Sequence, residues 1–147
     1  MIDDVIERWH QHLRGRLPGG LDELLDDEVV FYSPVVFTPQ RGKDVTALYL
    51  SAAAGTFDQP SEKAGDGDGS GGGGPFRYVK QTTGDNTAML EFETEMGGKY
   101  VNGVDIITCN DAGKIVEFKV LIRPLQAVNA VHEAMRAMLE QMQRGDA

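Results

Sequence analysis

The residue whose type and surroundings point most clearly to chemistry is Asp105. It interrupts an apolar stretch, Val101-Asn102-Gly103-Val104-Asp105-Ile106-Ile107, that has the composition of a strand. A carboxylate among apolar side chains loses hydration, which raises its pKa and favours the protonated, hydrogen-bond-donating form. Both parities of the stretch are partly apolar, so the residues alone do not fix the face that Asp105 occupies. Asp105 is therefore either a catalytic acid or base, or a structural aspartate held by a backbone amide or a neighbouring tyrosine.

The histidines are the next candidates for acid–base chemistry. His10 and His12 lie two residues apart in a helical segment, and therefore on different faces. Either could reach a pocket as a base, although a solvated position is the commoner one for a helix histidine. No carboxylate follows either histidine at i+4, so the spacing does not predict a metal site. His132, beside Val131, indicates a surface or interface position.

Neither the cysteine nor the glycine-rich stretch predicts a cofactor. Cys109, flanked by Thr108 and Asn110, is most simply a small packing residue. The stretch from residue 66 imitates the start of a calcium loop, but its twelfth position is Arg77 where such a loop needs glutamate. No Gly-Lys-Ser/Thr closes the glycine run to form a phosphate loop. We expect no metal and no cofactor.

Composition restricts the classes of partner. The 147 residues fit one domain, residues 1–147. The formal net charge of −9 repels phosphates, so we expect neither nucleic acid nor a membrane surface as partner. No apolar run is long enough to span a bilayer, and the N-terminal residues lack the pattern of a signal peptide. We therefore expect a cytoplasmic protein.

The elements that must position these residues follow from hydrophobic periodicity. Helical periodicity begins at Ile2, and a second short helix is expected near residues 21–25. A strand near 29–33 and a helix near 43–54 follow, and Pro124 opens a final apolar-striped helix. Between them we expect four strands, at 75–83, 87–96, 99–109 and 114–123. Residues 58–74, rich in glycine, are expected to form a flexible loop inside the domain, and a lid over a pocket is one role for it.

The strands alternate apolar and charged residues. In the second strand Ala88, Leu90 and Phe92 oppose glutamates, and in the fourth Phe118 and Val120 oppose charged residues. This alternation predicts an α+β fold with an antiparallel sheet that is wet on one face and covered by helices on the other.

The layout resembles the nuclear transport factor 2-like superfamily. The resemblance rests on Ser33-Pro34-Val35 before Gly42-Lys43-Asp44, and on the stretch 101–107 leading through Asp111-Ala112-Gly113-Lys114-Ile115 to Ile122-Arg123-Pro124. Together these segments resemble the SnoaL-like branch. The resemblance implies a cone-shaped curved sheet wrapped around N-terminal helices, a C-terminal helix, an apolar pocket and a homodimer.

The resemblance also implies roles for individual residues. It places Asp105 on the inner face of the sheet, where the ketosteroid isomerase branch carries an oxyanion-stabilising acid. That branch places its proton-abstracting aspartate where this chain has Ser33, whose hydroxyl is too weak a base. Its helix-one tyrosine is replaced by Trp9, which offers one N–H donor. These departures argue against steroid isomerisation.

Two functions remain open. In the first, a small hydrophobic molecule binds in the pocket and Asp105 catalyses an isomerase-, cyclase- or hydrolase-type reaction. In the second, the protein is a non-catalytic ligand-binding or dimerisation module. The residues expected to line the pocket are Trp9, Phe31, Ser33, Tyr49, Phe92, Phe118, Val120 and Ile122.

Overall fold

The structure is a computed structural model that describes residues 1–57 and 75–145. Its helices are α1 (Ile2–Leu13), α2 (Gly20–Leu24), α3 (Lys43–Phe57) and α4 (Leu125–Gly145). Its strands are β1 (Leu25–Tyr32), β2 (Gln40–Arg41), β3 (Arg77–Gly84), β4 (Thr87–Met96), β5 (Lys99–Cys109) and β6 (Ile115–Arg123). The predicted α+β class, with helices first and a closing helix last, is confirmed.

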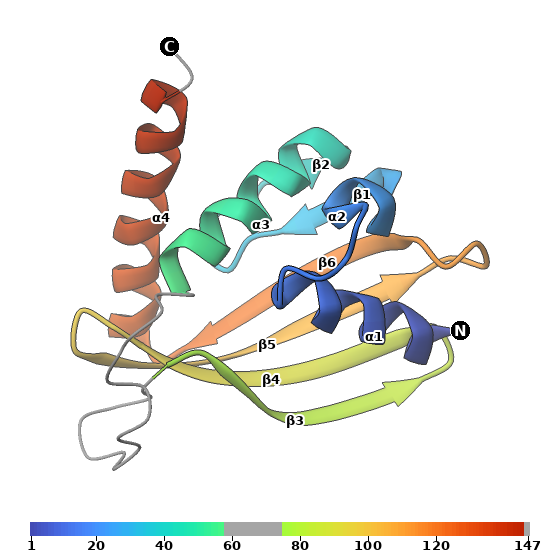
Figure 1. The fold of residues 1–147 in the computed structure, drawn as a ribbon. Helices are drawn as coiled ribbons and strands as arrows, with labels where there is room; N and C mark the ends of the chain where they lie inside the picture. The colour runs from blue at the N-terminus through green and yellow to red at the C-terminus, as the bar shows by residue number, and fades with distance from the viewer. Residues whose placement is uncertain (58–74, 146–147) are drawn as a thin grey trace.

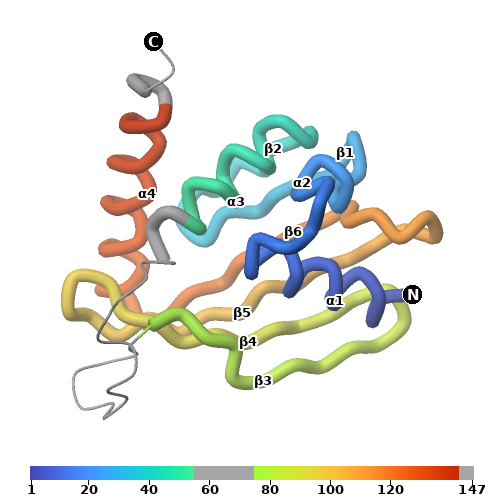
Figure 2. The backbone as a smooth tube through the Cα atoms, in the orientation of Figure 1, coloured from blue at the N-terminus to red at the C-terminus, as the bar shows by residue number. Residues whose placement is uncertain are grey.

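The strands form one curved sheet in the order β2-β1-β6-β5-β4-β3 (Figure 1). Strands β3 to β6 form an antiparallel meander, in which each strand lies beside the next one along the chain (Figure 2). Strand β1 instead runs parallel to β6, with Phe31 opposite Phe118. The sheet is therefore mixed, whereas the sequence pattern predicted only its antiparallel part.

Tight turns define the meander. Gly97 and Gly98 both have positive φ, at 59° and 79°, and join β4 to β5 in a two-residue hairpin. Asp85, with φ 53°, begins the turn from β3 to β4. Because such backbone angles favour glycine, asparagine and aspartate, these turns are visible in the sequence. The predicted strands at 87–96 and 99–109 coincide with β4 and β5.

Helices α1, α2 and α3 lie over one face of the curved sheet, and α4 stands across its end (Figure 1). Helix α1 buries the stripe Ile2, Val5, Ile6 and Trp9, whose spacing of three and four residues puts them on one side of the helix. In β4, the alternate residues Ala88, Leu90, Phe92 and Thr94 are buried, so they share one face of that strand. These surfaces enclose the core. No helix in the described part of the chain is long and apolar enough to span a membrane.

Gly103 in β5 has no room for a side chain. A Cβ atom there would collide with the ring of Phe92 and lie 2.6 Å from the carbonyl oxygen of Leu121. We expect Gly103→Ala to lower the free energy of unfolding by about 1–3 kcal/mol, because overpacking forces neighbours to shift. Urea denaturation measures this change. Gly84→Ala is the matched control, since a Cβ at Gly84 meets nothing within 4 Å, and equal losses in both variants would contradict the account.

Candidate functional site

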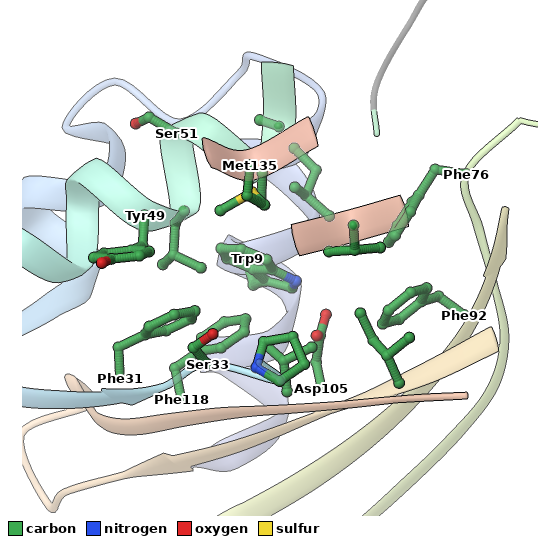
Figure 3. Close-up of a pocket in the computed structure, with 18 of the residues that line it drawn as sticks. Trp9, Phe31, Ser33, Tyr49, Ser51, Phe76, Phe92, Asp105, Phe118 and Met135 are labelled. Carbon is green, nitrogen blue, oxygen red and sulfur yellow. The ribbon is translucent and has the colours of Figure 1, made fainter. Parts of the chain in front are cut away.

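A cavity of about 710 Å³ lies between the sheet and helices α1, α3 and α4. The residues around it are predominantly apolar, and seven Phe, Trp and Tyr side chains are among them. All the residues that the sequence placed in a pocket lie on its wall: Trp9, Phe31, Ser33, Tyr49, Phe92, Phe118, Val120 and Ile122. In Figure 3, Phe31 and Phe118 rise from the sheet, while Tyr49 and Met135 approach from the helices. A cavity of this size and lining suits a small apolar ligand.

Asp105 lies on the same wall, and its carboxyl group projects into the cavity (Figure 3). Its side chain shares the inner face of β5 with the buried residues Val101 and Ile107. The register decides this face, because Asp105 pairs with the buried Leu90 of β4 on one side and with Val120 of β6 on the other. The residue is 6% exposed. The orientation that the sequence left open is thus inward.

A chain of two hydrogen bonds holds the Asp105 carboxyl group. The Tyr78 hydroxyl donates to Asp105 Oδ2 over 2.6 Å. The Trp9 indole N–H in turn donates to the Tyr78 oxygen over 3.0 Å. The sequence did not identify Tyr78. The sequence held one indication of its position: Phe76 and Tyr78 are two residues apart and so share one face of the predicted strand. The rest of that strand shows no alternation of apolar and polar residues.

The surroundings of Asp105 change its protonation. Burial raises the pKa of its carboxyl group from 3.8 to about 7, and the hydrogen bond from Tyr78 opposes part of this rise. Burial and the nearby Asp105 charge raise the pKa of Tyr78 well above its usual value, so the phenol stays protonated. Near neutral pH, Asp105 therefore exists in both charge states, which is the property of an efficient general acid or base.

Ser33 provides a second polar group on the cavity wall. Its hydroxyl oxygen accepts hydrogen bonds from the backbone N–H groups of Val35 and Val36, over 3.1 and 3.2 Å. These two bonds fix the oxygen as the chain leaves β1. The hydroxyl hydrogen is not used in either bond, so Ser33 can donate it to a ligand.

Two histidines of α1 also line the cavity, although the sequence favoured a solvated position. The His10 ring is hydrogen-bonded to Gln81 Oε1 over 3.1 Å. The His12 ring lies 5.6 Å from the Trp9 ring, centroid to centroid, and is partly buried. Burial lowers the pKa of His12, which leaves its imidazole neutral at pH 7.

Aromatic pairs stiffen opposite parts of the wall. Phe76 stacks on Phe92 with ring centroids 5.0 Å apart, and Phe31 stacks on Tyr49 at 5.5 Å. Between them, Trp9 meets Phe118 edge-on at 5.0 Å. Such pairs are favourable beyond the area they bury, so they preserve the shape of the cavity.

Comparison with solved structures places this fold among known proteins. The chain is similar to a steroid delta-isomerase from Pseudomonas aeruginosa, with 26% identity, a TM-score of 0.81, and coverage of 97% of this chain and 94% of that one. It is also similar to a protein with a cystatin-like fold from Silicibacter pomeroyi, with 29% identity, a TM-score of 0.71, and coverage of 90% and 83%. The chain has the fold of nuclear transport factor 2-like proteins, several of which are among the similar solved structures. A SnoaL-like family protein from Agrobacterium tumefaciens shares the fold at 12% identity, with a TM-score of 0.53 and coverage of 84% and 97%.

No family model and no curated protein sequence matches the chain, so the relationship rests on structure. Within this nuclear transport factor 2-like fold, the described part of the cavity wall contains one carboxylate, Asp105. Ser33 lies on the wall where the resemblance expects the proton-abstracting aspartate. The Trp9 N–H is already engaged with Tyr78. Ser33 and Trp9, the two residues that differ from those of the ketosteroid isomerase branch, therefore both line the cavity.

The remaining candidates lie away from the cavity. Cys109 is fully buried at the end of β5 and is absent from the described cavity wall. Within residues 1–57 and 75–145, no group of three or more His, Cys, Asp or Glu side chains could hold a metal ion. The predicted loop and lid at 58–74 lie outside the described residues.

Proposed function

We propose that the protein binds a small apolar carbonyl or ring compound in this cavity and exchanges a proton with it through Asp105. The observation that carries the proposal is a buried carboxyl group, directed into an apolar cavity, with a pKa of about 7. The reaction class is that of isomerases, cyclases and hydrolases that act on carbonyl compounds. A fold alone does not specify a reaction, so the site residues must do so.

Asp105 has two chemical uses, one in each charge state. When protonated, its free carboxyl oxygen donates a hydrogen bond to a ligand carbonyl oxygen and stabilises negative charge that develops there. When ionised, it removes a proton from the carbon next to that carbonyl, and the electron pair left behind moves into the enolate. Tyr78 donates to Oδ2 in both states. Oδ1 is therefore the oxygen that faces the substrate.

Ser33 and His12 extend this chemistry. The Ser33 O–H group supplies a second donor for a developing oxyanion. The neutral His12 imidazole supplies a proton acceptor on the α1 side of the cavity. Ser33 occupies the position of the aspartate base of the ketosteroid isomerase branch but is too weak a base, and His12 lies at a different position. We therefore do not propose steroid isomerisation, despite the similarity to a steroid delta-isomerase.

A non-catalytic ligand-binding module is the second candidate. It is favoured by the hydrogen bond between Tyr78 and Asp105, because a neighbouring tyrosine is one way to satisfy a purely structural aspartate. A structural acceptor would have a depressed pKa, whereas burial raises that of Asp105. We therefore favour the enzyme. The apolar ligand, the homodimer and the cytoplasmic location stay predictions.

Two probes of the same shape test the binding part of the proposal. We expect 2-acetylnaphthalene to bind about fivefold to tenfold more tightly than 2-ethylnaphthalene at pH 5.5, because protonated Asp105 donates one net hydrogen bond to the ketone. The preference should vanish at pH 8.5, where ionised Asp105 repels the carbonyl oxygen. Trp9, the single tryptophan and part of the cavity wall, reports binding through its fluorescence.

The hydrocarbon is the control for shape and apolar contact. Equal affinities for the two probes at pH 5.5 would contradict a hydrogen-bond-donating role for Asp105. No quenching of Trp9 by either probe would contradict an apolar binding cavity.

A further inference from the structure

The charged groups on the cavity wall are unlike those of the whole chain. The chain has 23 acidic and 14 basic residues, yet among the described wall residues the only carboxylate is Asp105. The basic and imidazole side chains on the same wall are Arg14, Arg77, Arg136, His10, His12 and His132. Basic side chains therefore outnumber carboxylates on the described wall, whereas acidic residues outnumber basic ones in the whole chain.

Two of the three arginines are already neutralised. Arg77 pairs with Glu93, with 2.7 Å between nitrogen and oxygen. Arg136 pairs with Glu133 at 3.0 Å and with Glu140 at 3.6 Å. These guanidinium groups have carboxylate partners within the protein, so a ligand would have to compete for them.

Arg14 differs from both. It follows the last residue of α1, it is exposed, and within residues 1–57 and 75–145 its guanidinium group has no hydrogen bond or ion pair. His12, two residues earlier on the same wall, likewise has no hydrogen-bond partner for its ring nitrogens in the described part of the chain. Two unused donor groups therefore line the cavity near the C-terminal end of α1, the end that points toward α4 in Figure 1.

The deeper wall is apolar. Trp9, Phe92 and Phe118 surround the space near Asp105 in Figure 3, and each of these side chains is buried. A ligand that satisfies both regions has an apolar body and one charged end. The sign of that end follows from Arg14, because a guanidinium group attracts anions and can bind a carboxylate through two parallel hydrogen bonds.

We propose that the ligand of this cavity is an amphipathic acid, whose apolar body packs against the aromatic wall and whose anionic group binds Arg14. This inference rests on the proposed function and names its substrate class. The anion belongs at Arg14 and not beside Asp105, since two carboxylates in an apolar site repel each other. The overall charge of −9 also repels anions, so a local cation is needed to hold one.

Two dyes that differ by one anionic group test the inference. 8-Anilinonaphthalene-1-sulfonate carries a sulfonate, and N-phenyl-1-naphthylamine is the same scaffold without it. We expect Arg14→Gln to weaken binding of the sulfonate about tenfold, because a charge-assisted hydrogen bond is lost, and to leave binding of the neutral dye unchanged. Energy transfer from Trp9 measures both affinities at the cavity.

Arg16→Gln is the matched control. Arg16 is exposed, has the same charge, lies two residues from Arg14, and is not on the described wall. It should change neither affinity. If the neutral dye binds and Arg14→Gln does not weaken the sulfonate, the amphipathic-acid inference fails while the proposed function stands. If neither dye binds, the proposed cavity function fails and the inference fails with it.

Discussion

Replacing Asp105 with asparagine is expected to slow a base-catalysed probe reaction about 10²–10³-fold, the usual contribution of a positioned general base. The probe is 5-nitrobenzisoxazole, an apolar ring compound. A base removes its one heterocyclic C–H proton, the electron pair forms the nitrile, and the N–O bond breaks to release a coloured phenolate. The proton ends on Asp105 and then passes to water. The reaction needs only a desolvated base in a cavity, so it tests the site without knowledge of the natural substrate.

The pH dependence of this reaction identifies the base. Only ionised Asp105 accepts a proton, so kcat/KM should rise through a pKa of about 7 and level off above it. Tyr78→Phe should move this profile to higher pH, because the hydrogen bond from Tyr78 lowers the pKa of Asp105. Asp111→Asn, at an exposed turn between β5 and β6, should change neither rate nor profile. An Asp105→Asn variant that keeps the wild-type rate would contradict the assignment.

The same Asp105→Asn substitution is expected to raise the free energy of unfolding at pH 8.5 by up to about 4 kcal/mol. Burial raises the pKa of Asp105 from 3.8 to about 7, and each unit corresponds to about 1.36 kcal/mol. The folded protein binds this proton more tightly than the unfolded chain does. The contribution of Asp105 to stability is therefore fully present below about pH 4 and is lost as the pH rises to about 7. Asparagine stays neutral and still offers Tyr78 a hydrogen-bond acceptor.

Urea unfolding of both proteins at several pH values, followed by Trp9 fluorescence, measures this difference. The advantage of the variant should be small near pH 4, grow toward pH 7 and stay constant above about pH 8. A variant that is less stable than the wild type at pH 8.5 would contradict a desolvated carboxylate. Higher stability together with lost proton transfer would show that the site is maintained for function at the expense of stability.

Local signals accounted for most of the fold. The hairpin at Gly97 and Gly98 and the turn at Asp85 require backbone angles that few residues adopt, so the strand ends were visible in the sequence. The stripe of α1 was equally visible, because its apolar residues recur at helical spacing. The parallel pairing of β1 with β6 was not visible in the sequence, since it joins segments far apart in the chain and leaves no local pattern.

The site was predicted in part for the same reason. Apolar residues that alternate with charged ones along the strands predicted the cavity wall. Strand β5, however, is apolar on both faces, and only its register with β4 and β6 shows that Asp105 points inward. Tyr78 was missed because β3 is exposed along most of its length and shows no amphipathic pattern. Its bond to Asp105 joins residues 27 positions apart. The approach of His12 and Arg14 to the cavity likewise depends on how the end of α1 packs.

The most direct test of the account is the titration of the Asp105 carboxyl carbon by NMR, with Asp105→Asn used to assign the signal. We expect a midpoint near pH 7, because burial of Asp105 disfavours the charged form more than the Tyr78 hydrogen bond favours it. A midpoint at or below about 3.9, the value of an ordinary aspartate, would contradict it and identify Asp105 as a structural hydrogen-bond acceptor.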